Sequence, residues 1–411
     1  MTSLSDKLQS LGVKLGARDL PPTRPRRREQ CGVEQVIPGR FRTTPQGELF
    51  VVERQYPADH RHGRAELRLT GSLHMIAEWA GERRLADAPP TTFAFLDTET
   101  TGLSGGTGTY AFLIGVGRFE GDQFHLIQYF MRDPLEEPAQ LAALADFLRP
   151  CEVLVTFNGK AFDVPLLNTR YITNGITSPL AALAQLDLLP LARRLWRDRL
   201  PSRALGQLEV HILQTVRTHD DVPGWLIPTV YFDYLRSGDA RPLGGVFYHN
   251  AMDVLAMAGL LNHISQQLAD PLGGRVEHGL DLVAMAKLFE ALSHFEQAVQ
   301  LYLAGLDEDL PEENYWDTLQ RLSFLHKRQG NWPAAIKLWQ QAAAEKQLYA
   351  HVELAKFYEH QARDLRQAAH WTQSALTIIG HPNCPRSARR QWRSALEHRL
   401  ARLQRKLNRR P

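Results

Sequence analysis

The chain has 411 residues, 44% of them hydrophobic and 23% charged, and a formal net charge of +3, which is typical of a globular protein with two or three hydrophobic cores. Its three cysteines lie far apart without a C-x-x-C pair, which argues against a disulfide framework or a zinc site and favours the reducing cytoplasm. The chain has no apolar signal core and no apolar stretch long enough to cross a membrane, so we expect neither export nor membrane insertion.

The first segment, residues 1–88, is predicted to be an irregular N-terminal leader that ends at a double proline. It contains a short amphipathic helix, then the basic run P-P-T-R-P-R-R-R at 21–28, then a strand-like F-V-V-E-R. A second basic segment lies at the other end of the chain, where the last 26 residues carry ten Lys or Arg and one acid. Such segments suit a polyanionic partner, although a solvated charged face explains each of them equally well.

Residues 89–270 show the pattern of an α/β domain. Three predicted strands come first, in the runs T-F-A-F-L-D, Y-A-F-L-I-G-V-G-R-F and Q-F-H-L-I-Q-Y-F, separated by glycine-containing turns. A helix, a buried strand C-E-V-L-V-T-F-N and a second helix from Val164 follow, and then a mostly helical stretch at 186–213. The Pro- and Gly-rich stretch 218–245 is predicted to be a loop, and a helix at 248–268 closes the domain. This order predicts a mixed sheet with flanking helices.

The remaining residues are predicted to be helical only. Within 280–380, Ala298 aligns with Ala335 after 37 residues and with Ala368 after a further 33, which brackets the 34-residue period of tetratricopeptide repeats. An unrelated helical bundle is the alternative. The basic segment 381–411 is predicted to form a last helix with an apolar stripe, which either caps the repeats or holds nucleic acid.

Four acids in the α/β region lie at spacings that suit metal chemistry. Asp97 and Glu99 are two positions apart on a predicted strand, so both side chains lie on one face. Asp163 follows a strand at the start of a helix, and His249 and Asp253 share one side of the closing helix. Mg²⁺ and Mn²⁺ prefer carboxylate oxygens, and two such ions can activate water and stabilise charge on a phosphate. The spacing therefore predicts phosphodiester hydrolysis, with Asp253 as the last metal ligand and a neutral His249 accepting the proton of the attacking water.

Each feature taken alone has an ordinary structural explanation. A D-x-E pair on a strand is common, an aspartate at a helix start is often an N-cap, and a His-x-x-x-Asp pair often lies on the surface. Lys160 is a candidate for a phosphate contact, and Asp187 and Arg203 are further candidates, although a solvated turn explains Lys160 and an amphipathic helix explains Asp187 as well. The order of the four acids on one strand and helix framework favours the functional interpretation.

Three motifs give the region from about 91 to 268 a resemblance to a known family: D-T-E-T-T-G-L-S-G-G-T-G-T-Y-A-F-L-I-G-V-G, F-N-G-K-A-F-D-V-P-L-L and H-N-A-M-D-V-L-A-M. They resemble the DEDD exonuclease superfamily of ribonuclease-H-like folds, and more closely its bacterial YprB-like branch. The resemblance implies a mixed five-stranded sheet with flanking helices, two Mg²⁺ or Mn²⁺ ions, and 3′-to-5′ hydrolysis of DNA or RNA ends. It also implies that the metal ligands are Asp97, Glu99, Asp163 and Asp253.

The last motif departs from the patterns of the family. One subfamily has His five residues before the final Asp and another has Tyr four residues before it, whereas here Tyr248 is five and His249 four residues before Asp253. Helical geometry brings His249 to the side of Asp253, so we predict His249 as the general base and keep Tyr248 as the alternative. The family often wedges a side chain near the terminal base at the position of Leu103. The residues expected to contact substrate are Thr98, Leu103, Asn158 and Lys160.

The leading hypothesis is a cytoplasmic, metal-dependent 3′-to-5′ exonuclease acting on DNA or RNA, with a single-stranded 3′ end favoured. Its helical repeats would recruit a protein partner or hold the substrate, and no membrane partner is expected. The alternative is a nucleic-acid-binding or scaffold protein with a catalytically weak nuclease-like domain. The presence of all four acids argues against this alternative, because a buried cluster of acids without metal is costly.

Overall fold

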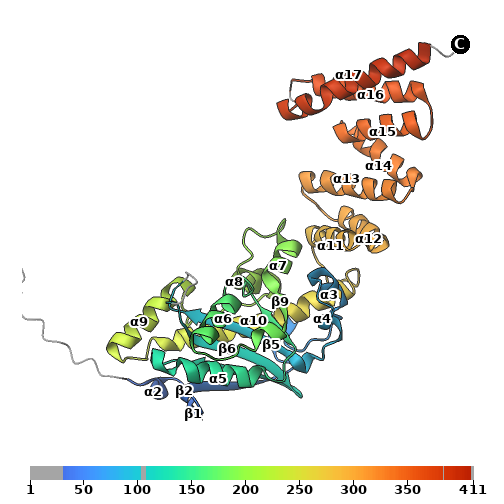
Figure 1. Ribbon diagram of the computed structural model, residues 1–411. Helices are drawn as coiled ribbons and strands as arrows, with labels where there is room; N and C mark the ends of the chain where they lie inside the picture. Colours follow the sequence, from blue (N-terminus) through green and yellow to red (C-terminus); the bar gives the residue numbers. More distant parts are fainter. Residues whose placement is uncertain (1–30, 103–107, 383, 409–411) are drawn as a thin grey trace, which may run out of the picture.

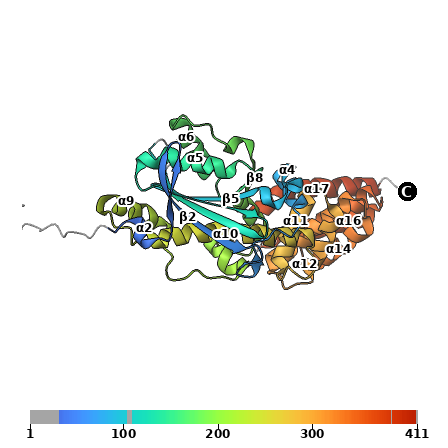
Figure 2. The ribbon, with the colours of Figure 1, turned by 90° about the horizontal axis from the view of Figure 1, so that it is seen from below.

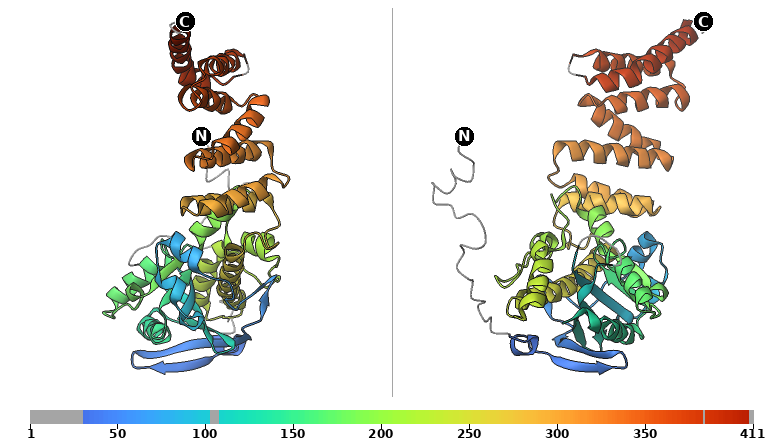
Figure 3. Two further views of the ribbon diagram at one scale, coloured as in Figure 1. Left: turned by 90° about the vertical axis from the view of Figure 1, so that its right-hand side faces the viewer. Right: turned by 60° about the vertical axis from the view of Figure 1, so that its left-hand side comes forward.

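The computed structural model describes residues 31–102, 108–382 and 384–408. The predicted N-terminal helix, the basic run at 21–28 and Leu103 lie outside the described residues. Figure 1 shows a sheet surrounded by helices, from which a stack of helices from α11 (Gly279–Ala291) to α17 (Arg386–Asn408) extends away. The two views in Figure 3 show the same elongated shape. In the described part of the chain, no helix combines the length and the apolar character needed to cross a membrane.

The sheet is mixed, as predicted, but it has seven strands rather than five. Its order is β1-β2-β7-β6-β5-β8-β9, antiparallel as far as β5 and parallel from β5 to β9. The strands are β1 (Arg40–Thr44), β2 (Gly47–Pro57), β5 (Phe93–Thr100), β6 (Ala111–Glu120), β7 (Gln123–Phe130), β8 (Val153–Thr156) and β9 (Ala184–Asp187).

The two additional strands come from the segment that was predicted to be an irregular leader. β1 and β2 form a hairpin, and β2 pairs with β7 from Phe50, opposite Phe130, to Pro57. Four consecutive buried residues from Leu49 to Val52 show that both faces of this strand are covered, which hides the alternation expected of a half-exposed strand. The leader prediction therefore missed an edge of the sheet.

Two hydrophobic cores fix which side chains of β5 face which helix. Phe93 and Phe95 belong to the core under α10 (Leu243–Ala269), whereas Ala94 and Leu96 belong to the core under α5 (Glu137–Leu148) and α6 (Asp163–Thr173). Figure 2 shows α5 and α6 on one side of the sheet and α10 on the other. Because side chains alternate along a strand, odd-numbered residues of β5 point towards α10 and even-numbered residues towards α5 and α6.

The stretches between these elements differ in part from the prediction. The predicted helical stretch 186–213 begins with the end of β9, and the predicted loop 218–245 contains a helix, α9. Pro228 lies in the first turn of α9, where a proline is tolerated, and Tyr231 is buried and donates its hydroxyl to the Met131 carbonyl at 2.9 Å. The elements are β3 (Arg61–His62), β4 (Ala65–Glu66), α2 (Val33–Val36), α3 (His74–Ala80), α4 (Arg84–Asp87), α7 (Leu188–Trp196), α8 (Leu205–Leu208), η5 (Glu209–Leu213), η6 (Gly224–Leu226) and α9 (Ile227–Ser237).

The described C-terminal region is helical throughout, as predicted. Its first helices share a core with the sheet, since Leu282 and Leu288 of α11 belong to the same buried cluster as Trp196 of α7. The aligned residues Ala298, Ala335 and Ala368 are all fully buried, and the tetratricopeptide assignment stays a prediction. The intervening helices are α12 (Phe295–Leu306), α13 (Glu312–Arg328), α14 (Trp332–Ala344), α15 (Leu348–His360) and α16 (Leu365–Gly380).

The last helix, α17, packs its apolar stripe onto the stack. Leu396 and Leu403 are buried, and Glu359 of α15 accepts hydrogen bonds from Arg399 and Arg402 at 2.7 Å. These contacts fit the capping role that was one of the two predictions for this segment.

Candidate functional site

The carboxyl end of β5 carries two acids on the face that α10 covers. Asp97 and Glu99 both point towards α10, as their spacing predicts. The side-chain amide of Asn250, on α10, donates to Asp97, at 2.9 Å to Oδ2 and 3.3 Å to the backbone oxygen. Asn250 fits there because Gly115 lies opposite Asp97 in the sheet, and a Cβ at Gly115 would collide with the amide. Gly115 and Asn250 together hold Asp97 against α10.

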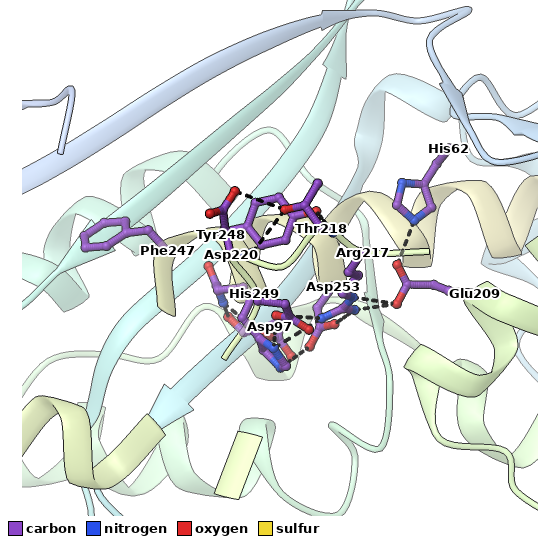
Figure 4. A network of polar contacts seen from close by, with 12 residues as sticks. His62, Asp97, Glu209, Arg217, Thr218, Asp220, Phe247, Tyr248, His249 and Asp253 are labelled. Atoms are coloured by element: carbon purple, nitrogen blue, oxygen red, sulfur yellow. Dashed lines mark hydrogen bonds and ion pairs between the residues drawn. The ribbon is translucent and has the colours of Figure 1, made fainter. Parts of the chain in front are cut away.

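Helix α10 brings His249 and Asp253 to the same site, as Figure 4 shows. His249 Nε2 lies 3.6 Å from Asp253 Oδ2, and His249 Nδ1 lies 2.8 Å from Asp221 Oδ1. Asp221 belongs to a loop that the sequence does not distinguish from ordinary surface. The hydroxyl of Tyr248 instead accepts a hydrogen bond from the Thr218 amide at 3.0 Å. Of the two residues considered as general base, His249 is the one beside Asp253.

Asp163 reaches the site from the opposite face of β5. It is the first residue of α6, and it accepts a short hydrogen bond from Thr98 Oγ1, which points away from Asp97 and Glu99. Burial raises the pKa of Asp163 to about 6. The negative charges of nearby acids, Asp253 among them, raise it as well, whereas the hydrogen bond from Thr98 lowers it. Asp163 is therefore close enough to interact with the other acids, while one of its oxygens is engaged by Thr98.

Burial and mutual repulsion make full ionisation of the acid cluster costly. The pKa of Asp97 lies well above its ordinary value, first because of burial and then because of Asp253, Glu99 and Asp163. Burial and repulsion from Asp253 and Asp163 likewise hold the pKa of Glu99 well above its ordinary value. Glu99 Oε1 is buried and has no hydrogen-bond partner among the described residues. Carboxylate oxygens that repel each other and lack partners fit a hard divalent cation such as Mg²⁺ or Mn²⁺.

The acid side chains do not by themselves enclose an ion. Among the residues that the structure describes, no group of three or more His, Cys, Asp or Glu is arranged so that it could hold a metal. Two contacts engage acids that a metal would need: Thr98 binds Asp163, and Arg217 binds Asp253. Each contact engages one carboxylate oxygen, Oδ1 in both acids, and leaves the other oxygen of that acid for a cation.

Arg217 is a part of the site that the sequence prediction missed. Its guanidinium donates to Asp253 and, at 2.8 Å, to Glu209 Oε2, and Glu209 Oε1 lies 2.9 Å from His62 Nε2. Burial disfavours the charged guanidinium, but Asp253 and Glu209 outweigh it and raise the pKa of Arg217. Burial opposes ionisation of Glu209 as well, but His62 and Arg217 lower its pKa. Arg217 lies outside any helix or strand, so no periodic pattern marked it.

A cavity of about 460 Å³ opens beside the acids. Arg217, His249 and Asp253 line one part of it, and α8 and the segment that follows line the rest, including the exposed side chains of Val210 and Val216. Its volume lies within the range of small-ligand sites. The cavity thus offers room for a nucleotide-sized group next to His249 and Asp253.

The remaining predicted residues have different surroundings. Asn158 and Lys160 lie in the turn before α6, and their backbone amides donate to Asp187 at 2.7 and 3.2 Å. Asp187 also caps α7 through the Leu189 amide at 3.0 Å, so its carboxylate stabilises two backbone turns. The side chains of Asn158 and Lys160 are exposed. Their substrate contacts stay predictions.

Three comparisons with known proteins bear on the chain. A family model described as the RNase H superfamily matches residues 94–265, a range that contains all four acids. The uncharacterized protein YprB of Bacillus subtilis (strain 168) is 32% identical over 338 residues, which make up 80% of this chain and 80% of that protein. Among solved structures, the family B DNA polymerase from the hyperthermophilic archaeon Pyrobaculum calidifontis is 16% identical, with a TM-score of 0.34 over 49% of this chain. The chain spans 29% of the length of that polymerase.

Proposed function

The chain belongs to the RNase H superfamily, and from this premise we propose that it is a metal-dependent nuclease that hydrolyses phosphodiester bonds of DNA or RNA, acting as a 3′-to-5′ exonuclease. The observation that carries the proposal is the convergence of four carboxylates at the end of β5, where each raises the cost of ionising its neighbours. Such a cluster is stabilised by cations, and divalent cations promote phosphodiester hydrolysis by activating water and stabilising charge on the phosphoryl oxygens.

The four acids would hold the cations, two of them in the proposed function. Asp97 and Glu99 present oxygens from β5, Asp253 from α10 and Asp163 from the start of α6. Divalent ions bound there would lower the pKa of a water molecule and stabilise the negative charge on the phosphoryl oxygens. Asn250 keeps Asp97 in place through its amide.

His249 is proposed as the general base. His249 Nδ1 lies 2.8 Å from the acceptor Asp221 Oδ1 and 3.3 Å from the donor Arg217 Nη1. In the tautomer in which Nδ1 donates to Asp221, the shorter contact, Nε2 carries the lone pair, on the side of Asp253 and next to the cavity. An imidazole held in that tautomer accepts a proton from water near neutral pH. Asp221 positions the ring, and Arg217 positions Asp253 through a hydrogen bond.

The test is cleavage of 5′-labelled single-stranded DNA and RNA with Mn²⁺, Mg²⁺ or EDTA. We compare the wild type with Asp97→Asn, which keeps the shape of the side chain, and with the control Asp122→Asn, whose side chain is 84% exposed and pairs only with Arg68. We expect a metal-dependent ladder of shortened products from the wild type and the control, and a loss of it in Asp97→Asn. Products cut uniformly within the strand would contradict the exonuclease proposal and indicate an endonuclease instead.

A second candidate function is nucleic-acid binding without cleavage. It is favoured by the hydrogen bond from Arg217 to Asp253, because a guanidinium can neutralise an acid where a metal would otherwise do so. The same assay separates the two candidates. A folded wild type that binds the oligonucleotides but leaves them intact with every metal would support this second function.

A further inference from the structure

The second feature of the molecule that suits a polyanion lies where the helical stack joins the sheet. A cavity of about 740 Å³ is formed there by α7, α11 and α13, with Trp79 of α3 on one wall. Six cations line it: Arg193, Arg194, Arg197, Arg203, Lys287 and Arg321. Three carboxylates act on these cations: Asp198, in the cavity wall; Asp317, which pairs with Lys287 and Arg321; and Glu290, whose charge acts on Arg321. Positive charge is therefore in excess.

Two arginines, one in α7 and one at its C-cap, are available to bind a ligand. Arg193 and Arg197 are exposed, and among the described residues neither makes a hydrogen bond or an ion pair with a side chain. Lys287 is held by Asp198 at 3.1 Å, whereas Arg203 Nε is buried without a partner in the described chain. Guanidinium groups with free donors match phosphate oxygens in a bidentate geometry.

The cavity is connected to the acid cluster through α7. The helix begins directly after Asp187 at the end of β9, and the Asp187 carboxylate accepts hydrogen bonds from the backbone amides of the turn that precedes Asp163. Arg193 is six residues after Asp187, which is about 9 Å along a helix, and Arg197 lies about one turn further. Both arginines therefore follow, within about three helical turns, the residue that holds the turn before Asp163. A nucleic-acid strand that ends among the acids and runs along α7 would meet them.

The geometry points to a binding site for the phosphodiester backbone of single-stranded DNA or RNA in this cavity, formed jointly by α7 and the first helices of the stack. The inference deepens the proposed nuclease function, and it gives the helical stack a role in holding the substrate. Backbone phosphates are the ligand because Arg193 and Arg197, one helical turn apart, suit repeated negative charge and carry no base-reading pattern. DNA and RNA share this chemistry, so both are used in the test.

The test is binding of fluorescein-labelled 20-nucleotide DNA and RNA to the full chain, measured by anisotropy in EDTA at several salt concentrations. Arg193→Ala/Arg197→Ala is compared with Arg149→Ala/Arg236→Ala, which removes the same charge from side chains that are 79% and 71% exposed on other helices. Each phosphate contact in a single strand contributes about 0.7 to the slope of log affinity against log salt. The pocket variant should lose about 1.4 of that slope, which is about 25-fold in affinity at 0.1 M salt relative to 1 M.

The outcomes separate this inference from the proposed function. A control that weakens binding as much as the pocket variant, or a wild type that binds neither nucleic acid, would overturn the inference. Equal competition by polyglutamate of the same length would do so too, because the cavity would then be a site for an acidic protein. Cleavage with Mn²⁺ is measured in parallel on the wild type: absence of cleavage with selective loss of binding in the pocket variant removes the nuclease function and leaves the binding site standing.

Discussion

Replacement of Arg217 by Met tests how the acid site is stabilised. Arg217 is the cation between Asp253 and Glu209, whose side chains are 17% and 1% exposed. Met fills a similar volume without charge, so Arg217→Met leaves two carboxylates facing each other with little water. His62 remains beside Glu209 at 2.9 Å and compensates part of one charge.

The expected cost follows from this burial. Removing one partner of a buried ion pair destabilises a protein by about 3 to 5 kcal/mol, because the remaining charge is uncompensated. Asp253 keeps some exposure and Glu209 keeps His62, so we expect the lower end, about 3 kcal/mol. For a unit of this size, where 1 kcal/mol corresponds to about 2 to 4 °C, Tm should fall by about 6 to 12 °C in EDTA.

Thermal unfolding with and without Mn²⁺ measures both parts of the reasoning. If Asp253 is a metal ligand, Mn²⁺ at about 100 times its Kd adds about 2.7 kcal/mol and should restore most of the lost Tm. The double variant Glu209→Gln/Arg217→Met is the matched control, and it should be more stable in EDTA than Arg217→Met because one uncompensated charge is gone. A Tm of Arg217→Met within about 1 °C of the wild type, or a further fall in the double variant, would refute this account of the site.

Three further predictions follow from the same geometry. His249→Ala should lower the cleavage rate by about 10² to 10⁴-fold with little change in oligonucleotide affinity, whereas Tyr248→Phe should leave the rate within a small factor; single-turnover kinetics checks both. Asp163 has a folded pKa of about 6 against 3.8 for the unfolded group, so between these values the folded state binds more protons at this site. As pH falls from about 6 to 4, the stability of the metal-free wild type should therefore rise relative to that of Asp163→Asn. A difference between their urea midpoints that moves the other way would contradict this. Truncation after residue 270 should give a protein that aggregates in size exclusion, because it removes Leu282 and its neighbours from the core shared with α7. A monodisperse monomer would contradict this.

The periodic parts of the fold could be predicted from the sequence. The strand runs around Asp97 and the helices from residue 280 onwards carry clear periods, and the structure has them in place. The strand-like run F-V-V-E-R lies in β2, but its place in the sheet was not predicted, because β2 pairs with β7 through residues 66 to 80 positions away. Local patterns do not report such pairing, and a strand buried on both faces shows no alternation.

The candidate site could be predicted only where spacing fixes geometry. Asp97 with Glu99, and His249 with Asp253, lie at strand and helix spacings, and each pair is side by side in the structure. Arg217 comes from a segment without regular structure, and its position depends on the fold around it. No rule of spacing relates such a residue to an acid 36 positions further along the chain.

The arrangement of β5 also explains why four acids can converge in a folded protein without cations. Asp97 and Glu99 occupy one face of the strand and Asp163 the other, so the strand itself separates them, and Thr98 supplies a donor to Asp163. Asn250 supplies a donor to Asp97, and Arg217 supplies a charge to Asp253, so each of three acids has one partner while Glu99 Oε1 has none. The free-energy cost of burying charge is thus largest at Glu99. A cation that binds Glu99 would stabilise the acid that the protein itself stabilises least.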